Sequence, residues 1–211
     1  VQKKVVVKND VEVTRVSKRE LARLQAEDDA RAAASFDRQQ KRRKPKIVEE
    51  EVNVARVETK KIVKKIGKKT YTIDAKFEPQ EVAFSGFPAG SIVIDSREKF
   101  LYLMESPFSA RRYGVAVGKE GLAFKGSVTV GDKQEWPRWI PTKEMIERSP
   151  EKYAQYADGM DGGPNNPLGA RAIYLYEGQK DTYLRIHGTT QPWTIGTAAS
   201  NGCFRMVNEH V

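Results

Sequence analysis

From residue 86 onward the chain is built of short apolar runs separated by turns that contain glycine or proline. None of these runs is longer than a strand, and β-branched and aromatic residues are frequent in them. Strand after strand with intervening turns predicts an all-β sandwich or barrel-like domain. The expected strands are 91–95 and 100–104, which form a hairpin around a turn at 96–99, and 112–117, 127–130, 172–176 and 182–187.

Two segments differ from this pattern. Residues 142–156 begin at an Ile-Pro-Thr step and are rich in helix-favouring residues, so a short helical insert is expected there. In the N-terminal third, Ser17 and Glu20 have the spacing of a capping box, which predicts a helix over 21–43. From 47 to 73, Val and Ile alternate with Lys and Glu, which indicates extended or weakly paired strands.

Positive charge is concentrated in the same third. Residues 1–70 carry 21 Lys and Arg against 11 Asp and Glu, whereas residues 71–211 carry 16 against 17. We therefore divide the chain into a basic, partly helical spacer or accessory region, 1–75, and a mainly β domain, 76–211. The basic run at 38–46 has no interleaved aromatic residues, so no nucleic-acid partner is expected. Anionic polymers or lipid headgroups fit this charge at least as well.

Several kinds of site are not expected. No apolar run approaches the roughly 20 residues of a membrane-spanning helix. One cysteine excludes an intramolecular disulfide, and the two histidines, His187 and His210, do not have a familiar metal-ligand spacing. The sequence has no P-loop and no glycine-rich dinucleotide fingerprint after a strand. We therefore expect no metal and no cofactor.

The only cysteine, Cys203, lies 16 positions after His187, beyond a turn-rich loop that is able to fold back on the strand ending at His187. A histidine in reach can take the thiol proton and later return it to a leaving amine. Gly202 permits close backbone approach, and Arg205 is expected on the same face as Cys203, to lower the thiol pKa or hold a carboxylate. These residues alone leave a second interpretation open: a small buried sulfur and a structural histidine.

The wider pattern resembles the L,D-transpeptidase catalytic domain (YkuD-like). The family signature is HG[ST], then an Ile-Gly step, then S-x-G-C, an apolar residue, Arg and Leu or Met. Upstream, the blocks at 88–95, 113–118, 136–141 and 166–171 also match recurring stretches of the family, so the resemblance covers roughly 86–211. The signature is carried here by His187, Gly188, Thr189, Ile195, Gly196, Ser200, Gly202, Cys203, Arg205 and Met206.

The resemblance implies a β-sandwich enzyme that is exported to the periplasm or cell envelope, although these residues contain no signal peptide. Such enzymes act on peptidoglycan: a cysteine attacks the bond between a diamino acid and the terminal D-alanine of a tetrapeptide stem. The resulting thioester passes its acyl group to an amine of another stem or of an envelope protein. Carbapenems acylate such enzymes. Cell-wall biogenesis and cell shape are the processes they serve.

The resemblance also implies roles for individual residues. Cys203 is the expected nucleophile and His187 the general base and then acid, with the Gly188 carbonyl orienting the imidazole. Gly202 and Cys203 are expected to donate backbone N–H groups to the oxyanion. Ser200, Arg205 and Asn201 are expected to shape the site, and Thr189, Trp193 and Arg171 are hypothetical substrate contacts.

Two features depart from the family pattern. Asn201 stands where many members have a histidine, so His187 is expected to be the sole base. The chain ends at Val211, where the family usually continues, so we expect its C-terminal end to be truncated. Two alternatives remain open: an L,D-carboxypeptidase, in which water is the acceptor, and a non-catalytic peptidoglycan-binding scaffold. The acceptor, the role of residues 1–75 and the oligomeric state are not predicted.

Overall fold

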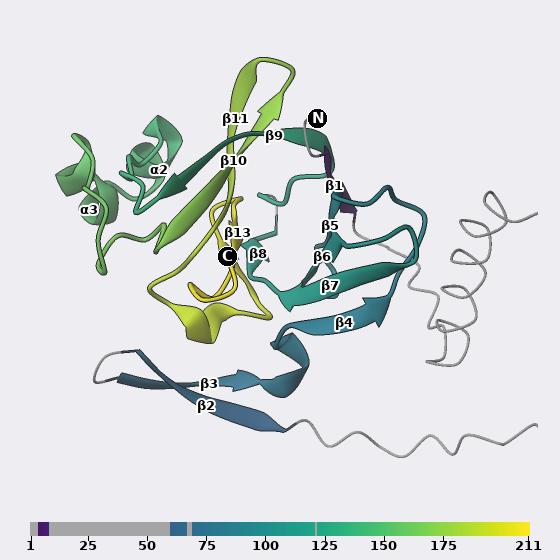
Figure 1. The fold of residues 1–211 in the computed structure, drawn as a ribbon. Coiled ribbons are helices and arrows are strands. Elements are labelled where there is room, and N and C mark those ends of the chain that lie inside the picture. The colour runs from purple at the N-terminus through teal and green to yellow at the C-terminus, as the bar shows by residue number, and fades with distance from the viewer. Residues whose placement is uncertain (1–3, 9–59, 67–68, 121) are drawn as a thin grey trace, which may run out of the picture.

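The computed structural model describes residues 4–8, 60–66, 69–120 and 122–211. Its body is a nine-stranded sheet (Figure 1). In spatial order the strands are β13 (Phe204–Arg205), β11 (Lys180–His187), β10 (Arg171–Glu177), β9 (Gly126–Glu135), β1 (Lys4–Lys8), β5 (Ile92–Asp95), β6 (Phe100–Met104), β7 (Ser109–Gly114) and β4 (Gln80–Ala83). Two smaller sheets pair β8 (Val117–Gly118) with β12 (Ala198–Ser200), and β2 (Lys61–Ile66) with β3 (Lys69–Asp74).

The predicted mainly β class is confirmed. The hairpin of β5 and β6 has Asp95 opposite Phe100, with the expected turn between them. The predicted strand at 112–117 is interrupted: β7 ends at Gly114 and β8 begins at Val117. Ala116 leaves the ladder because it pairs with Arg205 instead, so this segment is drawn toward the C-terminal part of the chain. The predicted helix at 21–43 and its capping box lie outside the described residues.

Strand β1 was not expected from the sequence. It lies in the middle of the large sheet, parallel to β5 and antiparallel to β9. Val5 and Val7 are buried against the neighbouring strands. A second segment from the predicted spacer, the hairpin β2–β3, packs beneath the sheet in Figure 1. The boundary at 75 stays a prediction, but two segments before it contribute to the core of the domain that follows it.

The sheet packs its core on both of its faces, because side chains alternate along each strand. Ile92 and Ile94 belong to one buried cluster and Val93 belongs to the other. The first cluster reaches the C-terminal strands, where Ile186 and Phe204 are fully buried. Burying a side chain of this size is worth about 2–3 kcal/mol. These residues therefore fix β11 and β13 against the body.

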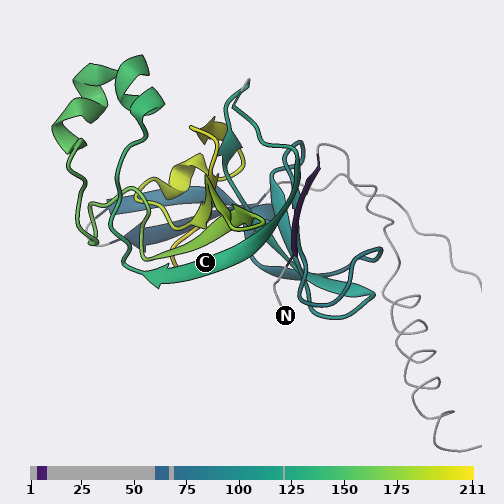
Figure 2. The ribbon, with the colours of Figure 1, turned by 90° about the horizontal axis from the view of Figure 1, so that it is seen from above.

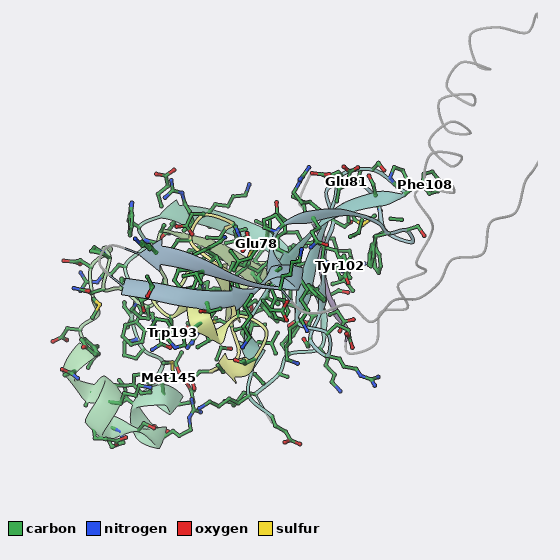
Figure 3. All side chains as sticks on the ribbon, turned by 90° about the horizontal axis from the view of Figure 1, so that it is seen from below. Glu78, Glu81, Tyr102, Phe108, Met145 and Trp193 are labelled. Atoms are coloured by element: carbon green, nitrogen blue, oxygen red, sulfur yellow. The ribbon has the colours of Figure 1, made fainter. Side chains whose placement is uncertain are left out.

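The second cluster is covered by the hairpin β2–β3. Tyr71 and Ile73 are buried there with Phe77, which belongs to the 3₁₀ turn η1 (Ala75–Phe77). Lys64 forms an ion pair with Glu78 at 2.7 Å, which ties the hairpin to the chain that follows it. Figure 3 shows the hairpin from below, with Glu78 on the chain beside it. The hairpin is thus part of the domain's packing.

The predicted helical insert is present as α2 (Lys143–Arg148), α3 (Pro150–Tyr153) and the 3₁₀ turn η2 (Ala154–Tyr156). Thr142 caps α2 by accepting a hydrogen bond from the Met145 N–H. Neither helix has a buried residue, and Figure 2 shows both standing away from the strands at one end of the body. None of the described helices is long and apolar enough to cross a membrane.

Candidate active site

The site is organised by the pairing of β13 with β11. Ile186 pairs with Phe204, and His187 pairs with Arg205, in a parallel ladder. Ile186 and Phe204 point into the core, so the alternating positions His187, Cys203 and Arg205 face the other side. All three line one cavity of about 450 Å³, a size typical of small-molecule sites.

The cavity has two walls. One comes from β11, β13 and the segment between them, and the other from the helical insert. The insert supplies aromatic and charged side chains that the sequence analysis did not assign to the site. Those lining residues are Thr142, Glu144, Met145, Arg148, Lys152, Tyr153 and Tyr156.

His187 is held as a neutral base. Its side chain is 5% exposed, and Nδ1 lies 2.6 Å from the carbonyl oxygen of Gly188. A carbonyl oxygen only accepts, so Nδ1 carries the proton and Nε2 has the free lone pair. Burial lowers the pKa of His187 to about 4, against the raising effect of the Gly188 carbonyl. The imidazole is therefore neutral at pH 7.

Gly188 cannot be replaced by a larger residue without moving its neighbours. A Cβ there would lie 2.2 Å from Oδ1 of Asn208. That oxygen accepts the N–H of Thr189 at 3.0 Å and of Ala170 at 3.2 Å. Asn208 thus holds the turn whose carbonyl orients His187. Asn208, which lies five positions after Cys203, was not predicted from the sequence.

Cys203 is partly buried, and its thiol donates to the carbonyl oxygen of Tyr183, with Sγ 3.6 Å from that oxygen. Burial raises the pKa of the Cys203 thiol. The backbone N–H of Arg185 and the guanidinium groups of Arg185 and Arg205 act against that rise. At neutral pH the site therefore holds a protonated thiol beside a neutral imidazole.

Gly202 has φ +121°, a left-handed conformation that favours glycine. Its N–H donates to Ser200 Oγ at 3.2 Å, and the Ser200 hydroxyl donates to the carbonyl of Cys203. Ser200 thereby shapes the turn that carries the cysteine. Two backbone N–H groups, those of Gly202 and Cys203, are expected to bind the oxyanion. Ser200 Oγ accepts the N–H of Gly202 but not that of Cys203.

Arg205 lies on the same side of β13 as Cys203, as expected. Its Nη1 donates to Gln191 Oε1 at 3.2 Å, which fixes the guanidinium at the cavity wall. Burial lowers the pKa of Arg205, but an arginine keeps its charge at neutral pH. The site therefore has a fixed positive charge next to the sulfur.

Asn201 joins the two walls of the cavity. Arg148 Nη2 donates to Asn201 Oδ1 at 3.2 Å, and Asn201 Nδ2 donates to the Tyr153 hydroxyl at 3.0 Å. Both partners belong to the helical insert. The amide of Asn201 therefore links the cysteine turn to the insert rather than taking part in proton transfer.

The three hypothetical substrate contacts have different positions. Thr189 is buried and lines the cavity. Trp193, in the 3₁₀ turn η3 (Pro192–Thr194), is 55% exposed and does not line the cavity. Arg171 is also outside it, where it pairs with Glu135 at 3.1 Å on the neighbouring strand. The structure thus brings Thr189, but not Trp193 or Arg171, to the cavity.

No group of three or more His, Cys, Asp or Glu residues in the described part of the chain is arranged to hold a metal ion. The charged side chains that line the cavity are the basic Arg148, Lys152 and Arg205 and the acidic Glu144. They can recognise an anionic substrate next to a nucleophile that a neutral imidazole can deprotonate.

Comparison with known proteins identifies the class to which this fold and site belong. The family model of the L,D-transpeptidase catalytic domain (YkuD) matches residues 89–211. The match covers more than half of the chain, so the chain belongs to the YkuD family.

Relatives carry the same family name. A probable L,D-transpeptidase ErfK/SrfK of Escherichia coli K12 is 27% identical over 136 residues, which cover 63% of this chain and 42% of that protein. A putative L,D-transpeptidase from the ATP synthase subunits region of Fuscovulum blasticum is 32% identical over 131 residues, which cover 56% of this chain and 64% of that protein. The chain therefore spans about two fifths to two thirds of the length of these curated relatives.

One solved structure is also similar. A crystal structure from Brucella melitensis, described as a probable carnitine operon oxidoreductase CaiA, is 65% identical and has a TM-score of 0.52. The match covers 65% of this chain and 86% of that one. The oxidoreductase description applies to that protein, whereas the family model and the curated relatives agree on L,D-transpeptidase.

Proposed function

We propose that the chain is a cysteine-dependent acyltransferase of peptidoglycan, an L,D-transpeptidase. Its donor substrate is a tetrapeptide stem, cut between the L-centre of the diamino acid and the terminal D-alanine. The observation that carries this proposal is that Cys203, His187 and Arg205 line one cavity in a chain of the YkuD family. The intact set also argues against a non-catalytic peptidoglycan-binding scaffold.

The first half-reaction forms a thioester. His187 Nε2 takes the proton from the Cys203 thiol, and the sulfur attacks the carbonyl carbon of the bond to D-alanine. The carbonyl oxygen becomes an oxyanion, which the Cys203 N–H stabilises. When the intermediate collapses, the C–N bond breaks and the protonated His187 gives its proton to the leaving amine. D-alanine departs, and the acyl group remains on Cys203.

The second half-reaction reverses these roles. An amine attacks the thioester carbon while His187 takes its proton, and the C–S bond breaks as the thiolate leaves and takes the proton back. The side-chain amine of another stem gives a cross-link, and an amine of an envelope protein gives an anchored protein. If water is the acceptor, the same acyl-enzyme gives L,D-carboxypeptidase activity.

The charge of the cavity suits such a substrate. Arg205 of β13 lines it, and the insert contributes Arg148 and Lys152 together with the acidic Glu144, so basic side chains outnumber acidic ones in the lining. Stem peptides carry free carboxylates, which a guanidinium can bind through two hydrogen bonds. This chemistry supports a location in the cell envelope or periplasm, where stem peptides occur. The same nucleophile is expected to be acylated by carbapenems.

The test is incubation with a tetrapeptide-stem muropeptide, followed by measurement of released D-alanine and of the products. A cross-linked dimer identifies a transpeptidase, and a tripeptide stem without dimer identifies a carboxypeptidase. Cys203→Ala is expected to abolish the release of D-alanine. Glu105→Gln, which breaks an exposed ion pair with Arg111 on the distant strand β7, is the matched control and should retain it. Release of D-alanine by Cys203→Ala would contradict the proposal.

A further inference from the structure

Strand β11 contains a bulge beside the cysteine. In its ladder with β10, Arg185 pairs with Tyr174 and Asp181 pairs with Tyr176, so residues 182–184 stand opposite the single residue Leu175. Within the bulge, Tyr183 has φ +60°, which is unfavourable for a residue with a bulky side chain. Strained backbone of this kind persists only when its surroundings hold it, and it is concentrated at functional sites.

The charged side chains at the two ends of the bulge hold each other. Arg185 donates through Nη1 and Nη2 to the two carboxylate oxygens of Asp181, each at 2.7 Å. This bidentate ion pair is partly shielded from water: the Arg185 side chain is 12% exposed and that of Asp181 is 31% exposed. The guanidinium also lies 4.1 Å from the ring centre of Tyr174, which fixes its plane.

The same carboxylate determines the backbone conformation of the bulge. Asp181 Oδ1 accepts the N–H of Tyr183 at 2.8 Å. Thr182 adds a second support, because its hydroxyl donates to the Leu175 carbonyl at 2.6 Å and accepts the N–H of Leu184 at 3.2 Å. The Tyr183 peptide is therefore held in place by side chains of the bulge itself.

The bulge faces the sulfur of Cys203. The carbonyl oxygen of Tyr183 accepts the thiol, with Sγ 3.6 Å away. Cys203 is the residue before Phe204, which pairs with Ile186, so the parallel register brings Cys203 level with Arg185. The bulge thus presents the carbonyl of Tyr183 to the thiol. Two residues later, Arg185 presents its backbone N–H and its positive charge to the same sulfur.

We propose that Asp181 and Arg185 are positioning residues for the nucleophile: their ion pair holds the bulge of β11 so that the Tyr183 carbonyl anchors the Cys203 thiol. The proposal rests on the proposed function only in taking Cys203 as the reacting group. Neither residue touches the cavity, so both act through the backbone and through their charge. Neither Asp181 nor Arg185 belongs to the family signature, which begins at His187.

The charges around the sulfur predict the direction of each change. Arg185 and Asp181 lie on β11, Arg205 lies on β13, and the neutral His187 ends β11. The two guanidinium groups lower the pKa of the thiol, whereas the Asp181 carboxylate and the burial of the sulfur raise it. Removing the Asp181 charge therefore favours the thiolate. It also frees the carbonyl that binds the protonated thiol, which acts in the same direction.

The test uses the fact that Cys203 is the only cysteine of the chain. Its alkylation by iodoacetamide, followed by intact-mass spectrometry from pH 6 to 10, reports thiolate formation without any substrate. Asp181→Asn is expected to shift the midpoint of this profile downward. Arg185→Gln is expected to shift it upward. Arg185→Lys keeps the charge but loses the paired hydrogen bonds that hold the bulge, so its midpoint is expected between that of Asp181→Asn and that of the wild type.

A second readout separates positioning from charge. Asp181→Asn and Arg185→Lys are each expected to slow acylation by a carbapenem about tenfold or more, because the sulfur is no longer anchored. For Asp181→Asn the thiolate forms more easily while acylation slows, a combination that general damage to the fold does not produce. Glu105→Gln removes the carboxylate that pairs with Arg111 of β7 at the surface and should change neither readout.

The proposal is overturned if folded Asp181→Asn has the alkylation profile and the acylation rate of the wild type. If Asp181→Asn does not fold, Arg185→Lys is used instead. Acylation of Arg185→Lys at the wild-type rate also overturns the proposal. A wild-type protein that forms no carbapenem adduct contradicts the proposed function instead. In that case the alkylation profiles still decide whether the ion pair positions the thiol.

Discussion

The side-chain amide of Asn201 donates a hydrogen bond of 3.0 Å to the hydroxyl of Tyr153, across 48 residues of sequence. This bond and the one from Arg148 connect the cysteine turn to a helical insert that buries none of its own helical residues. Asn201 stands where a titratable histidine was the expectation from the family pattern. Its role here is to fix the wall of the cavity.

Replacing Asn201 with alanine is expected to loosen the insert. Two hydrogen bonds are lost, each worth about 0.5–1.5 kcal/mol, so amide protection over residues 143–156 should fall about tenfold. Hydrogen–deuterium exchange measures this directly. Gln155→Ala, a change on the insert itself at a residue that bonds only the Lys152 carbonyl, is the control and should leave the protection unchanged. Equal exchange in wild type and Asn201→Ala would show that the insert does not depend on Asn201.

The pH dependence of acylation is expected to follow His187. Burial lowers its pKa to about 4, so the imidazole is a neutral base above that pH and a protonated non-base below it. Above about pH 5, protonation of His187 should therefore no longer affect the rate constant for acylation by a carbapenem. As the pH is lowered further, this rate constant should fall with a midpoint near pH 4. A rate that falls instead around pH 6.5, the ordinary value for histidine, would show that the imidazole is not buried as described.

Replacing His187 with alanine removes the base altogether. His187→Ala should reduce the rate of carbapenem acylation by roughly 10²–10⁴-fold at pH 7.

Gly202→Ala is expected to remove activity at a modest cost in stability. The left-handed φ of +121° disfavours alanine by about 1–3 kcal/mol, and relaxing it moves the turn that carries the cysteine. Gly178 has φ +60° in the turn between β10 and β11, with open space around it, so Gly178→Ala is the matched control. Both variants should lose stability in urea unfolding, but only Gly202→Ala should lose carbapenem acylation. Normal acylation by Gly202→Ala would mean that the conformation of this glycine is not needed.

Strand β1 is expected to be needed for the stability of the whole sheet. Val5 and Val7 are buried between β5 and β9, so truncation of either to alanine should cost about 2 kcal/mol in the free energy of unfolding. Urea unfolding measures the loss. Lys4→Ala, at an exposed position of the same strand, should be within about 0.5 kcal/mol of wild type. Unchanged stability in both valine variants would place β1 outside the folded domain.

Local patterns explain which parts of the fold the sequence predicts. The runs 91–95 and 100–104 are complete strands with their turn between them, and the helical insert carries its own cap at Thr142. Strand β1 was missed because its three valines lie between lysines, in a run too short to predict a strand alone. Its partners, β5 and β9, are more than 80 residues away, and only the folded sheet reveals them.

In the site too, residues in a local sequence pattern are predicted, whereas residues that depend on distant partners are not. The signature predicts His187, Gly188 and Cys203 because these residues lie within 17 positions of one another. Asp181 and Arg185 have no such pattern, because a β-bulge depends on the register with β10 rather than on local sequence. Trp193 and Arg171 are close to the signature in sequence, but neither lines the cavity: Trp193 is exposed on the turn η3, and Arg171 pairs with Glu135.

The most direct test of the central claim is the intact mass of the protein after incubation with a carbapenem. If Cys203 is the nucleophile, the wild-type chain gains the mass of one carbapenem and Cys203→Ala gains none. An adduct that persists in Cys203→Ala would contradict the assignment of the nucleophile. Wild-type protein that is folded and reduced but stays unmodified would contradict the account as a whole.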